Sequence, residues 1–460
     1  MTGIRRLAVV DIGKTNAKVV LVDLATQAEI EIRRTPNEVT ASGAYPHHDV
    51  GRLWLFVKEA LASLAVRSKI DAIVVTTHRA TAALVKADGS LALPVLVYEH
   101  DGPAALAQSY AAVRPGFGET GSPRLPNGLN LGAQLFWQSR AFPDRFAEVS
   151  SILPYPQYWA FRLSGVAAAE ATSLGCHTDL WDPARRDWSS LVDHMGWRDR
   201  MPALRMAADR LGPVSPRLAA ELGLDPGTPV LCGIHDSNAS LYPHLVSRSA
   251  PFSVVSTGTW VVVLSVGGAL DHLDPERDCL VNVDARGDPV PSARFMGGRE
   301  YSLALGREAA PAAGAAAGPV LDAGIMLLPS LVAGCGPFPA SRWRWLGEEA
   351  SLDGGMRFTA VSFYLAMMTA TCLELTGADG PVIVEGPFAR NAAYLDMLGV
   401  AAGRPVLASG GSVTGTSLGA ALLAAPGTRP KFALDLVPPH PQAEAMARYF
   451  ARWKDEVQRR

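Results

Sequence analysis

The sequence predicts an α/β protein built from two structurally related halves. Strand-like apolar runs alternate with helical patterns along most of the 460 residues, which favours sheets covered by helices. A strand, a polar turn and a second strand at residues 7–25 recur at residues 252–266, which places Gly13 and Gly258 at matching points of the two repeats. The length alone predicts two or three domains.

The expected elements follow from local patterns in chain order. Residues 49–65 carry apolar side chains at helical spacing, and the short apolar run 70–78 is typical of a buried parallel strand. The further expected elements are strands at 29–35, 228–234, 381–386 and 403–410, and helices at 238–245, 360–375, 416–424 and 443–458. Residues 265–295 are expected to be irregular, because they mix Asp, Arg, Gly and Pro. Residues 309–320 are low in complexity and fit either a frayed helix, which alanine favours, or a mobile connector, which glycine and proline favour.

The composition excludes several classes of protein. With a formal net charge of -2, the chain carries no large field of one sign, so we expect neither nucleic acid nor membrane as a partner. The first residues show no signal-peptide pattern, and no stretch reaches the roughly 18 uninterrupted apolar residues of a spanning helix. A soluble, cytoplasmic protein is therefore expected.

Cysteines and lysines narrow the classes further. Five cysteines are scattered singly, which argues against a disulfide framework or a zinc knuckle and predicts reduced, mostly buried thiols. No lysine occurs between Lys86 and Lys431, so the P-loop motif is excluded from the middle of the chain. A G-x-G-x-x-G dinucleotide fingerprint is also absent at the first strand.

The turn of the first predicted hairpin is typical of a phosphate site. It comprises Asp11, Ile12, Gly13, Lys14, Thr15, Asn16, Ala17 and Lys18. Glycine allows backbone N–H groups to approach phosphate oxygens, and the turn also offers a carboxylate for a magnesium shell and a nearby cation. The same pattern fits an ordinary hairpin with a polar tip. The second turn, Ser256-Thr257-Gly258-Thr259, favours the phosphate interpretation, because a nucleotide held between two lobes needs a hairpin from each.

Asp236 lies at a predicted strand-to-helix junction. A carboxylate at this point can project into a cleft and accept the proton of an alcohol during phosphoryl transfer, a reaction that otherwise depends on positioning and charge neutralisation. An aspartate before a helix more commonly caps that helix, and the local sequence alone favours the cap.

Four motifs, in this order and spacing, resemble the FGGY carbohydrate kinases: the hairpin around Asp11, the segment GIHDSNA, the turn STGTW and the helix TSLGAALLA. The resemblance covers essentially the whole chain. It implies the duplicated fold of actin, Hsp70 and hexokinase, whose two lobes each contain a ribonuclease-H-like core. The implied domains are an N-terminal kinase domain (1–243), a C-terminal nucleotide-binding domain (244–430) and a helical tail (431–460). Residues 84–101 and 153–189 look most similar to the rhamnulokinase and fuculokinase side of the family.

The resemblance also implies roles for individual residues. It makes Asp236 the catalytic base and places Asp11 in the magnesium shell of the cofactor ATP. The implied phosphate and nucleotide contacts are Gly13, Lys14, Thr15, Asn16, Lys18, Gly258, Thr259, Glu385, Gly386 and Asn391. The implied sugar contacts are His78, Arg79, Asp101, Gln157, Tyr158, His235 and Asp236. For His78 and Arg79, a surface ion pair or a helix-end contact is an equally good interpretation.

Two residues depart from the family pattern. Lys14 stands where many relatives carry serine or threonine, so it could neutralise phosphate directly. Glu385 replaces one glycine of the usual adenosine motif, which predicts a narrower or differently hydrogen-bonded nucleotide pocket.

The predicted activity is ATP-dependent phosphorylation of a sugar, such as L-rhamnulose, L-fuculose, ribulose or xylulose, by a two-lobed enzyme. A homodimer is the expected assembly. The rival interpretation is a non-catalytic, actin-like or chaperone-like nucleotide switch, which would need no sugar-side residues. A kinase of the ROK type is disfavoured, because the cysteines do not form its zinc motif.

Overall fold

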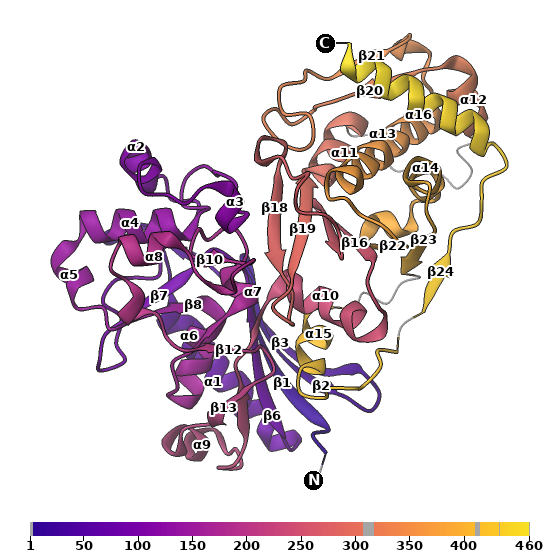
Figure 1. The fold of residues 1–460 in the computed structure, drawn as a ribbon. Coiled ribbons are helices and arrows are strands. Elements are labelled where there is room, and N and C mark those ends of the chain that lie inside the picture. The colour runs from indigo at the N-terminus through magenta and orange to yellow at the C-terminus, as the bar shows by residue number, and fades with distance from the viewer. Residues whose placement is uncertain (1–2, 307–316, 410–414, 432, 460) are drawn as a thin grey trace. The chain divides into compact units, whose positions relative to one another are not determined.

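The computed structural model describes residues 3–306, 317–409, 415–431 and 433–459 (Figure 1). Contacts divide the chain into two compact units. Unit 1 comprises Met1–Arg248, Val281–Pro289 and Thr414–Lys431, and unit 2 comprises Ser249–Leu280, Val290–Val413 and Phe432–Arg460. The first division therefore falls at Arg248, close to the predicted boundary after residue 243. The tail beyond residue 432 is counted with unit 2.

Unit 1 is built on a sheet in the order β13-β14-β6-β1-β2-β3, in which β15 also pairs with β6. The strands of unit 1 are β1 (Arg6–Ile12), β2 (Asn16–Asp23), β3 (Ala28–Pro36), β4 (Val39–Thr40), β5 (His47–His48), β6 (Ala72–Thr77), β7 (Ala82–Val85), β8 (Ser151–Pro154), β9 (Ala169–Glu170), β10 (Trp181–Asp182), β11 (Asp187–Trp188), β12 (Leu204–Arg205), β13 (Arg210–Pro213), β14 (Pro229–Leu231) and β15 (Ile234–His235). Its helices are α1 (Val50–Arg67), α2 (Ala107–Ala111), α3 (Phe117–Thr120), α4 (Leu131–Ala141), α5 (Pro143–Ala147), α6 (Tyr155–Ser164), α7 (Ala171–Leu174), α8 (Ser190–His194), α9 (Pro216–Leu222), α10 (Asp236–Ser247) and α15 (Thr416–Leu422).

Both faces of this sheet are covered, which explains why β6 reads as an uninterrupted apolar run. One face packs against residues of α1, α6 and α9, and the other packs against α10 and α15. Asp49 caps α1 by accepting a hydrogen bond from the Arg52 backbone N–H. The distant segment α15 thus completes a core that begins at the N-terminus.

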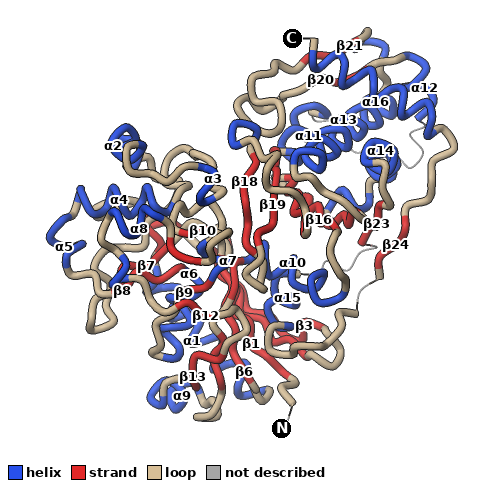
Figure 2. The backbone as a smooth tube through the Cα atoms, in the orientation of Figure 1, coloured by secondary structure: helices blue, strands red, loops and turns tan. Residues whose placement is uncertain are grey.

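Unit 2 contains a second sheet, in the order β18-β19-β17-β16-β22-β23-β24. Its strands are β16 (Phe252–Thr257), β17 (Val261–Val266), β18 (Cys279–Val283), β19 (Pro289–Phe295), β20 (Met326–Leu328), β21 (Arg344–Leu346), β22 (Val382–Glu385), β23 (Val406–Ser409) and β24 (Leu434–Leu436). Its helices are α11 (Gly297–Leu305), α12 (Ala317–Ala323), α13 (Gly354–Leu375), α14 (Ala392–Ala402) and α16 (Ala443–Gln458). Figure 2 shows, in each unit, strands flanked by helices.

Helix α13 is the central helix of the unit 2 core. It is long and apolar enough to cross a membrane by composition, but 83% of its apolar window is buried within the protein. Its neighbours in the core include buried residues of α14 and α16, so its apolar character is explained by packing. The tail helix α16 has the predicted bounds, and its Trp453 indole N–H donates to the Leu327 carbonyl at 2.9 Å.

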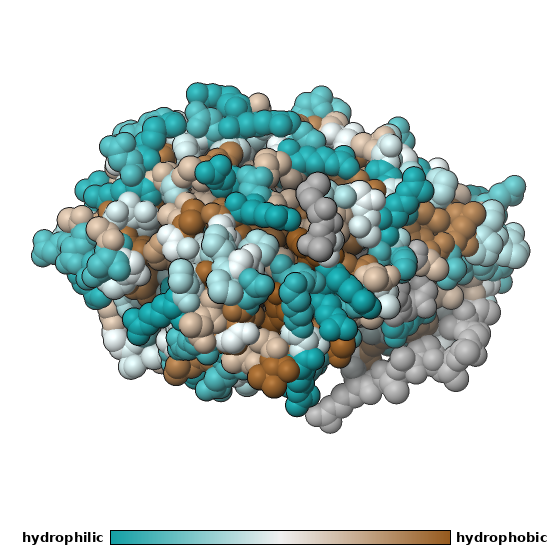
Figure 3. Space-filling view, turned by 90° about the horizontal axis from the view of Figure 1, so that it is seen from below, coloured by the Kyte–Doolittle hydropathy of each residue, from teal (hydrophilic) through white to brown (hydrophobic). Residues whose placement is uncertain are grey.

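The two predicted hairpins are confirmed. The expectation of irregular structure at residues 265–295 holds for residues 267–274 but is wrong for residues 279–283 and 289–295. This segment contains β18 and β19, whose residues are largely buried in the core. The two strands pair with each other on either side of a charged turn, and this pairing outweighs the low strand propensity of the segment as a whole. The predicted irregular segment 309–320 lies mostly outside the described residues. Hydrophilic residues cover most of the face in Figure 3, and hydrophobic residues occur there in small groups.

Candidate active site

Three adjacent strand ends in unit 1 bring the predicted site residues together. Strand β6 pairs in parallel with β1 on one side, where Asp11 lies opposite Thr76, and with β15 on the other, where Ile234 lies opposite Thr76. Parallel strands end at the same edge of a sheet, so the residues that follow them converge. These are the Gly13 turn, the His78–Arg79 bend and the Asp236 helix start.

Asp236 is the first residue of α10, and His235 is the N-cap residue. Asp236 Oδ1 lies 2.9 Å from His235 Nε2 and accepts a hydrogen bond from the Ser237 backbone N–H at 2.7 Å. Burial by itself would raise the pKa of Asp236, but the charge and hydrogen bond of His235, with a contribution from Arg79, lower it to about 2. The side chain is 34% exposed. Asp236 is therefore an ionised, accessible carboxylate at neutral pH.

Sequence analysis missed the residues that hold this junction in place. The Thr172 hydroxyl accepts the His235 backbone N–H at 3.1 Å and donates to the Glu170 carboxylate at 2.6 Å. Asn238 Nδ2 lies 3.0 Å from His235 Nδ1. Glu170 and Thr172 lie in a stretch of small residues far from Asp236 in sequence, so no local pattern could connect them.

Asp11 forms an ion pair with Lys18, at 3.3 Å between Oδ2 and Nζ, across the β1–β2 hairpin. Burial raises the pKa of Asp11 to about 6, although Lys18 opposes the shift. The turn itself closes through a 2.9 Å hydrogen bond from the Gly13 N–H to the Asn16 carbonyl. Asn37, which sequence analysis missed, braces the turn by donating from Nδ2 to the Gly13 carbonyl at 2.7 Å.

His78 and Arg79 follow β6 beside this turn. The His78 backbone N–H donates to the Ile12 carbonyl at 3.0 Å, and burial lowers the pKa of its imidazole to about 4, so the ring is neutral at pH 7. Its Nε2 is buried and has no hydrogen-bond partner among the described residues. Arg79 Nη1 donates to Cys176 Sγ at 2.8 Å. Both side chains belong to the cluster around Asp236.

Lys14, which was predicted to neutralise phosphate directly, contacts Glu99 and Tyr98 in the structure. Its Nζ lies 2.6 Å from Glu99 Oε2 and 5.0 Å from the centre of the Tyr98 ring. The Tyr98 ring in turn lies 5.8 Å from the His78 ring, edge to face. Asn16 Nδ2 donates to Thr15 Oγ1 at the tip of the same turn. Contact of Lys14, Thr15 or Asn16 with phosphate stays a prediction.

Three predicted sugar contacts lie in other surroundings. Gln157 is buried, and its Nε2 donates to the Cys232 and Gly233 carbonyls just before the His235 strand. Tyr158 belongs to the hydrophobic core and accepts a hydrogen bond from Arg162 Nη1. The Asp101 side chain is 86% exposed at the start of a short 3₁₀ helix. Among the described contacts, none joins these three side chains to Asp236, His78 or Arg79, and their contact with a sugar stays a prediction.

The second predicted phosphate turn lies in unit 2, between β16 and β17. The turn holds Gly258 and Thr259, and the start of α11 packs against it, because the Gly298 N–H donates to the Thr259 carbonyl at 3.2 Å. A side chain on Gly298 would overlap with the Gly258 carbonyl. At Gly258 itself the nearest atom to an added Cβ is 3.8 Å away, so that side of the turn is open. Gly298 was not predicted from the sequence.

The predicted adenosine motif follows β22 in the same unit. Gly386 has φ +83°, and a side chain there would overlap with the Thr257 carbonyl, so only glycine fits beside the β16 end. The Glu385 carbonyl accepts the Thr257 hydroxyl, and the Glu385 residue is buried. Asn391 caps α14 through the Tyr394 N–H and donates to Ser362. The motif is therefore held by the second turn.

Each turn, taken by itself, fits one part of a magnesium nucleotide. A single buried carboxylate suffices for Mg²⁺, which keeps several waters and binds through one or two carboxylates together with phosphate oxygens. Asp11 provides such a carboxylate at the edge of the sheet that also carries Asp236, with Lys18 Nζ 3.3 Å from its Oδ2. The open face of Gly258 fits the close approach of a phosphate to a backbone.

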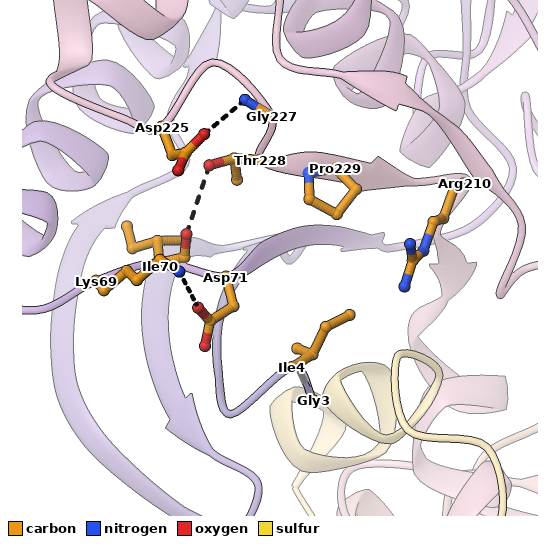
Figure 4. Close-up of a pocket in the computed structure, with 10 residues that line it drawn as sticks. All are labelled: Gly3, Ile4, Lys69, Ile70, Asp71, Arg210, Asp225, Gly227, Thr228 and Pro229. Carbon is orange, nitrogen blue, oxygen red and sulfur yellow. Dashed lines mark hydrogen bonds and ion pairs between the residues drawn. The ribbon is translucent and has the colours of Figure 1, made fainter. Parts of the chain in front are cut away.

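A separate polar pocket in unit 1 of about 270 Å³ lies at the opposite ends of the strands (Figure 4). Its lining includes Lys69–Asp71, which precede β6, and Gly227–Pro229, which lead into β14. The Lys69 and Asp71 side chains pair with each other at 3.3 Å, and Asp225 accepts the Gly227 N–H. Ligands of open α/β sheets bind at the carboxyl ends of strands, so this pocket is not the active-site candidate.

Each unit has a sheet with an equivalent hairpin, and in unit 1 the strand β15 leads into a helix that begins with a carboxylate, Asp236. This arrangement is the duplicated α/β fold of the sugar kinases and actin-like ATPases. A crystal structure of a carbohydrate kinase from Novosphingobium aromaticivorans has this fold, with a TM-score of 0.91, 35% identity and 99% coverage of both chains. The model "FGGY family of carbohydrate kinases, N-terminal domain" matches residues 7–242, and the model "Carbohydrate kinase FGGY, C-terminal domain" matches residues 249–431. The chain belongs to the FGGY family of carbohydrate kinases.

Two curated relatives match over shorter segments. L-fuculokinase of Salmonella typhi is 25% identical over 275 residues, which is 58% of this chain and 57% of that protein. Autoinducer-2 kinase of Escherichia coli is 30% identical over 156 residues, which is 34% of this chain and 29% of that protein. The match therefore spans less than two thirds of either relative.

Proposed function

We propose that the protein transfers the γ-phosphoryl group of ATP to a hydroxyl group of a sugar, with Asp236 as the general base. The observation that carries the proposal is the position of Asp236. Its carboxylate is ionised, is 34% exposed, and lies at the same sheet edge as the Asp11 turn. An ionised carboxylate can orient the acceptor hydroxyl and take its proton as the bond to phosphorus forms.

The low pKa of Asp236 is compatible with this role. A base with a pKa of about 2 is weak, and general-base catalysis is most efficient when the pKa is near the operating pH. In phosphoryl transfer through a loose transition state, however, positioning and charge neutralisation dominate over proton abstraction. His235 and Thr172 fix the carboxylate, which serves positioning directly.

The remaining polar groups have complementary proposed roles. Asp11 holds the magnesium ion, which when bound offsets the charge of the phosphate oxygens. Backbone N–H groups of the Gly13 turn in unit 1 and the Gly258 turn in unit 2 contact phosphate. His78, a neutral imidazole with a buried ring nitrogen that lacks a described partner, pairs with an acceptor hydroxyl. Glu385, Gly386 and Asn391 belong to the adenosine side.

The acceptor is proposed to be a small sugar. L-rhamnulose, L-fuculose, ribulose and xylulose are the first candidates, since the chain resembles the fuculokinase and rhamnulokinase side of the family and matches L-fuculokinase over 275 residues. One changed side chain can alter which hydroxyl is paired, so the panel must be broad.

The test is ADP release with Mg-ATP against ketoses, aldoses, polyols and sugar acids, with Asp236→Asn in parallel. Turnover that depends on one or a few acceptors and disappears in the variant is the expected result. ADP release that no acceptor stimulates would overturn the proposal and point to a nucleotide-dependent switch.

We also propose a cytoplasmic location and a homodimer. The five cysteines are free and buried, as in proteins of reducing compartments that contain ATP. Cell fractionation and light scattering test these two points.

A further inference from the structure

Arg79 is a partly buried cation that has no ion-pair partner among the described residues. Its one described side-chain hydrogen bond is to Cys176 Sγ, a weak acceptor, at 2.8 Å. Asp236 contributes to the electrostatic field at Arg79 but forms no ion pair with it, and the described partners of its Oδ1 are His235 and Ser237. A guanidinium has five N–H donors, so Arg79 retains donors for a ligand.

Arg114, a second arginine of unit 1, is neutralised by a carboxylate of the protein itself. Arg114 contacts the buried Asp179 carboxylate through two nitrogens, Nε and Nη2, each at 3.1 Å. Asp179 is further bound by Tyr110 and Asn130. Buried charges are normally paired in this way, because an unpaired charge away from water is costly. Arg79 is within the field of the Asp236 carboxylate but contacts no carboxylate among the described residues, so its donors are available to an anion that arrives from outside.

Lys14 adds positive charge on the same side. Its charge lowers the pKa of both His48 and His78, which places the ammonium near these rings. Its partner Glu99 is 61% exposed, so water screens that ion pair and Lys14 can exchange it for a ligand anion. The neutral, buried His48 and His78 rings, 5.1 Å apart, contribute no compensating negative charge.

We infer that the acceptor of this kinase is a sugar acid, a polyhydroxylated carboxylic acid whose carboxylate binds Arg79 while one of its hydroxyl groups faces Asp236. Arginine binds a planar carboxylate through two parallel N–H donors, which supplies both affinity and orientation. The inference rests on the proposed kinase activity and puts sugar acids ahead of the neutral ketoses that similarity to L-fuculokinase suggests. Arg79 is thus assigned as the specificity residue.

The experiment compares carbon-matched pairs of acceptors, namely aldonates of five and six carbons and the neutral aldoses, ketoses and polyols of the same length. The native enzyme is expected to use one aldonate with kcat/KM at least about 10-fold above its neutral counterparts. Arg79→Gln is expected to raise KM for the acid roughly 10- to 100-fold with little change for neutral compounds, because a charge-assisted pair is lost. Arg79→Lys should retain part of the preference, because it keeps the charge.

Arg124→Gln is the matched control, because Arg124 is exposed and its loss changes the net charge equally. Neutral sugars preferred over acids by the native enzyme would overturn the inference and leave the kinase proposal intact. An equal fall of kcat for every acceptor in Arg79→Gln would also overturn it, since the guanidinium would then serve the transferred phosphoryl group.

Calorimetric titration of each aldonate against native protein and Arg79→Lys separates the two proposals. If no acceptor stimulates ADP release, the kinase proposal fails, and acid binding that depends on Arg79 still reports on this site. Absence of binding by all acids overturns the inference. Thermal unfolding of the Arg79 variants checks that the lost Cys176 contact has not unfolded unit 1.

Discussion

The β1–β2 hairpin of unit 1 and the β16–β17 hairpin of unit 2 share one pairing scheme but differ in charge. In each, the first strand pairs antiparallel with the second and parallel with a later strand, β6 or β22. Register places Asp11 of unit 1 at the position of Ser256 in unit 2, and their cross-strand partners are Lys18 and Val262. One duplicated scaffold therefore carries a buried ion pair in unit 1 and an uncharged turn in unit 2.

The difference extends to the parallel strand beside each hairpin. Asp11 lies opposite Thr76, and the chain continues to His78 and Arg79, whereas Ser256 lies opposite Glu385, and the chain continues to Gly386. Unit 1 thus carries charged and titratable side chains at this edge. In unit 2 a glycine, Gly386, lies close to the Thr257 backbone carbonyl. The two hairpins share one strand pairing, and they differ in the charge and the glycine content of the residues at this edge.

The largest expected effect comes from Asp236→Asn in unit 1. Loss of the base should reduce kcat by roughly 100-fold or more, while Tm and ATP affinity change little. Steady-state kinetics, calorimetry and thermal unfolding measure these three quantities. Asp199→Asn, at an exposed position, is the control. Retention of more than about a tenth of the native rate would contradict the assignment of the base.

Asp11→Asn and Ser256→Ala compare the two hairpins at equivalent positions. The first change removes the carboxylate proposed for magnesium and leaves Lys18 unpaired, so kcat should fall by roughly 100-fold and the magnesium requirement should rise. The second removes an exposed hydroxyl and should cost less than about 3-fold. Activity titrated against Mg²⁺ gives both values. Equal sensitivity of the two positions would show that the charge difference has no functional meaning.

Glycine substitutions test the backbone character of the unit 2 turn. Gly298→Ala and Gly386→Ala should each lower stability by about 1–3 kcal/mol, because the added methyl group meets a carbonyl oxygen. Gly258→Ala has open space and should leave Tm unchanged while raising KM for ATP if phosphate approaches the turn. Thermal unfolding and ATP kinetics separate the two effects. An unchanged KM for ATP in Gly258→Ala would remove this turn from the phosphate site.

Two buried histidines of unit 1 should each make the folded state less stable on acidification. Burial depresses the folded-state pKa of His78 to about 4 and that of His48 well below its ordinary value, whereas both are near 6.5 in the unfolded chain. The unfolded state therefore binds more protons at these two histidines below pH 6.5, and their contribution to stability falls as the pH decreases from 6.5 towards 4, by at most about 1.4 kcal/mol per pH unit for each histidine. Burial raises the folded-state pKa of Asp11 to about 6 and that of Glu170 to about 7, so these carboxyl groups contribute in the opposite direction, and the histidine part is measured as a difference between variants. Denaturant unfolding at several pH values measures the slope.

Substitution identifies the histidines responsible for this pH dependence. His48→Phe should flatten the slope, because it removes one titrating group from a buried position without a described hydrogen-bond partner. His272→Phe in unit 2 should not, since that side chain is 68% exposed. A slope that is unaffected by His48→Phe would contradict the assignment.

Sequence patterns predicted what depends on neighbours along the chain. The hairpins, α1 and α16 follow from local sequence patterns, and Asp236 was found at its strand-to-helix junction. The supporting contacts could not be predicted, because they join distant segments. Thr172 reaches His235 across 63 positions, and Asn37 reaches Gly13 across 24. Lys14 was recognised as unusual, but its partner Glu99 comes from another loop.

The late position of α15 in the chain affects how the protein can be synthesised. This helix packs on β1 and β6 together with α10, so the first strands to leave the ribosome keep part of one apolar face uncovered until residues 416–422 have been made. A fragment that ends at residue 248 would expose the part of that face, and of α10, that α15 covers, and exposed apolar surface promotes aggregation. A recombinant unit 1 should therefore be supplied with residues 414–431 in trans. Alternatively, the gene can be circularly permuted so that α15 is translated before β1.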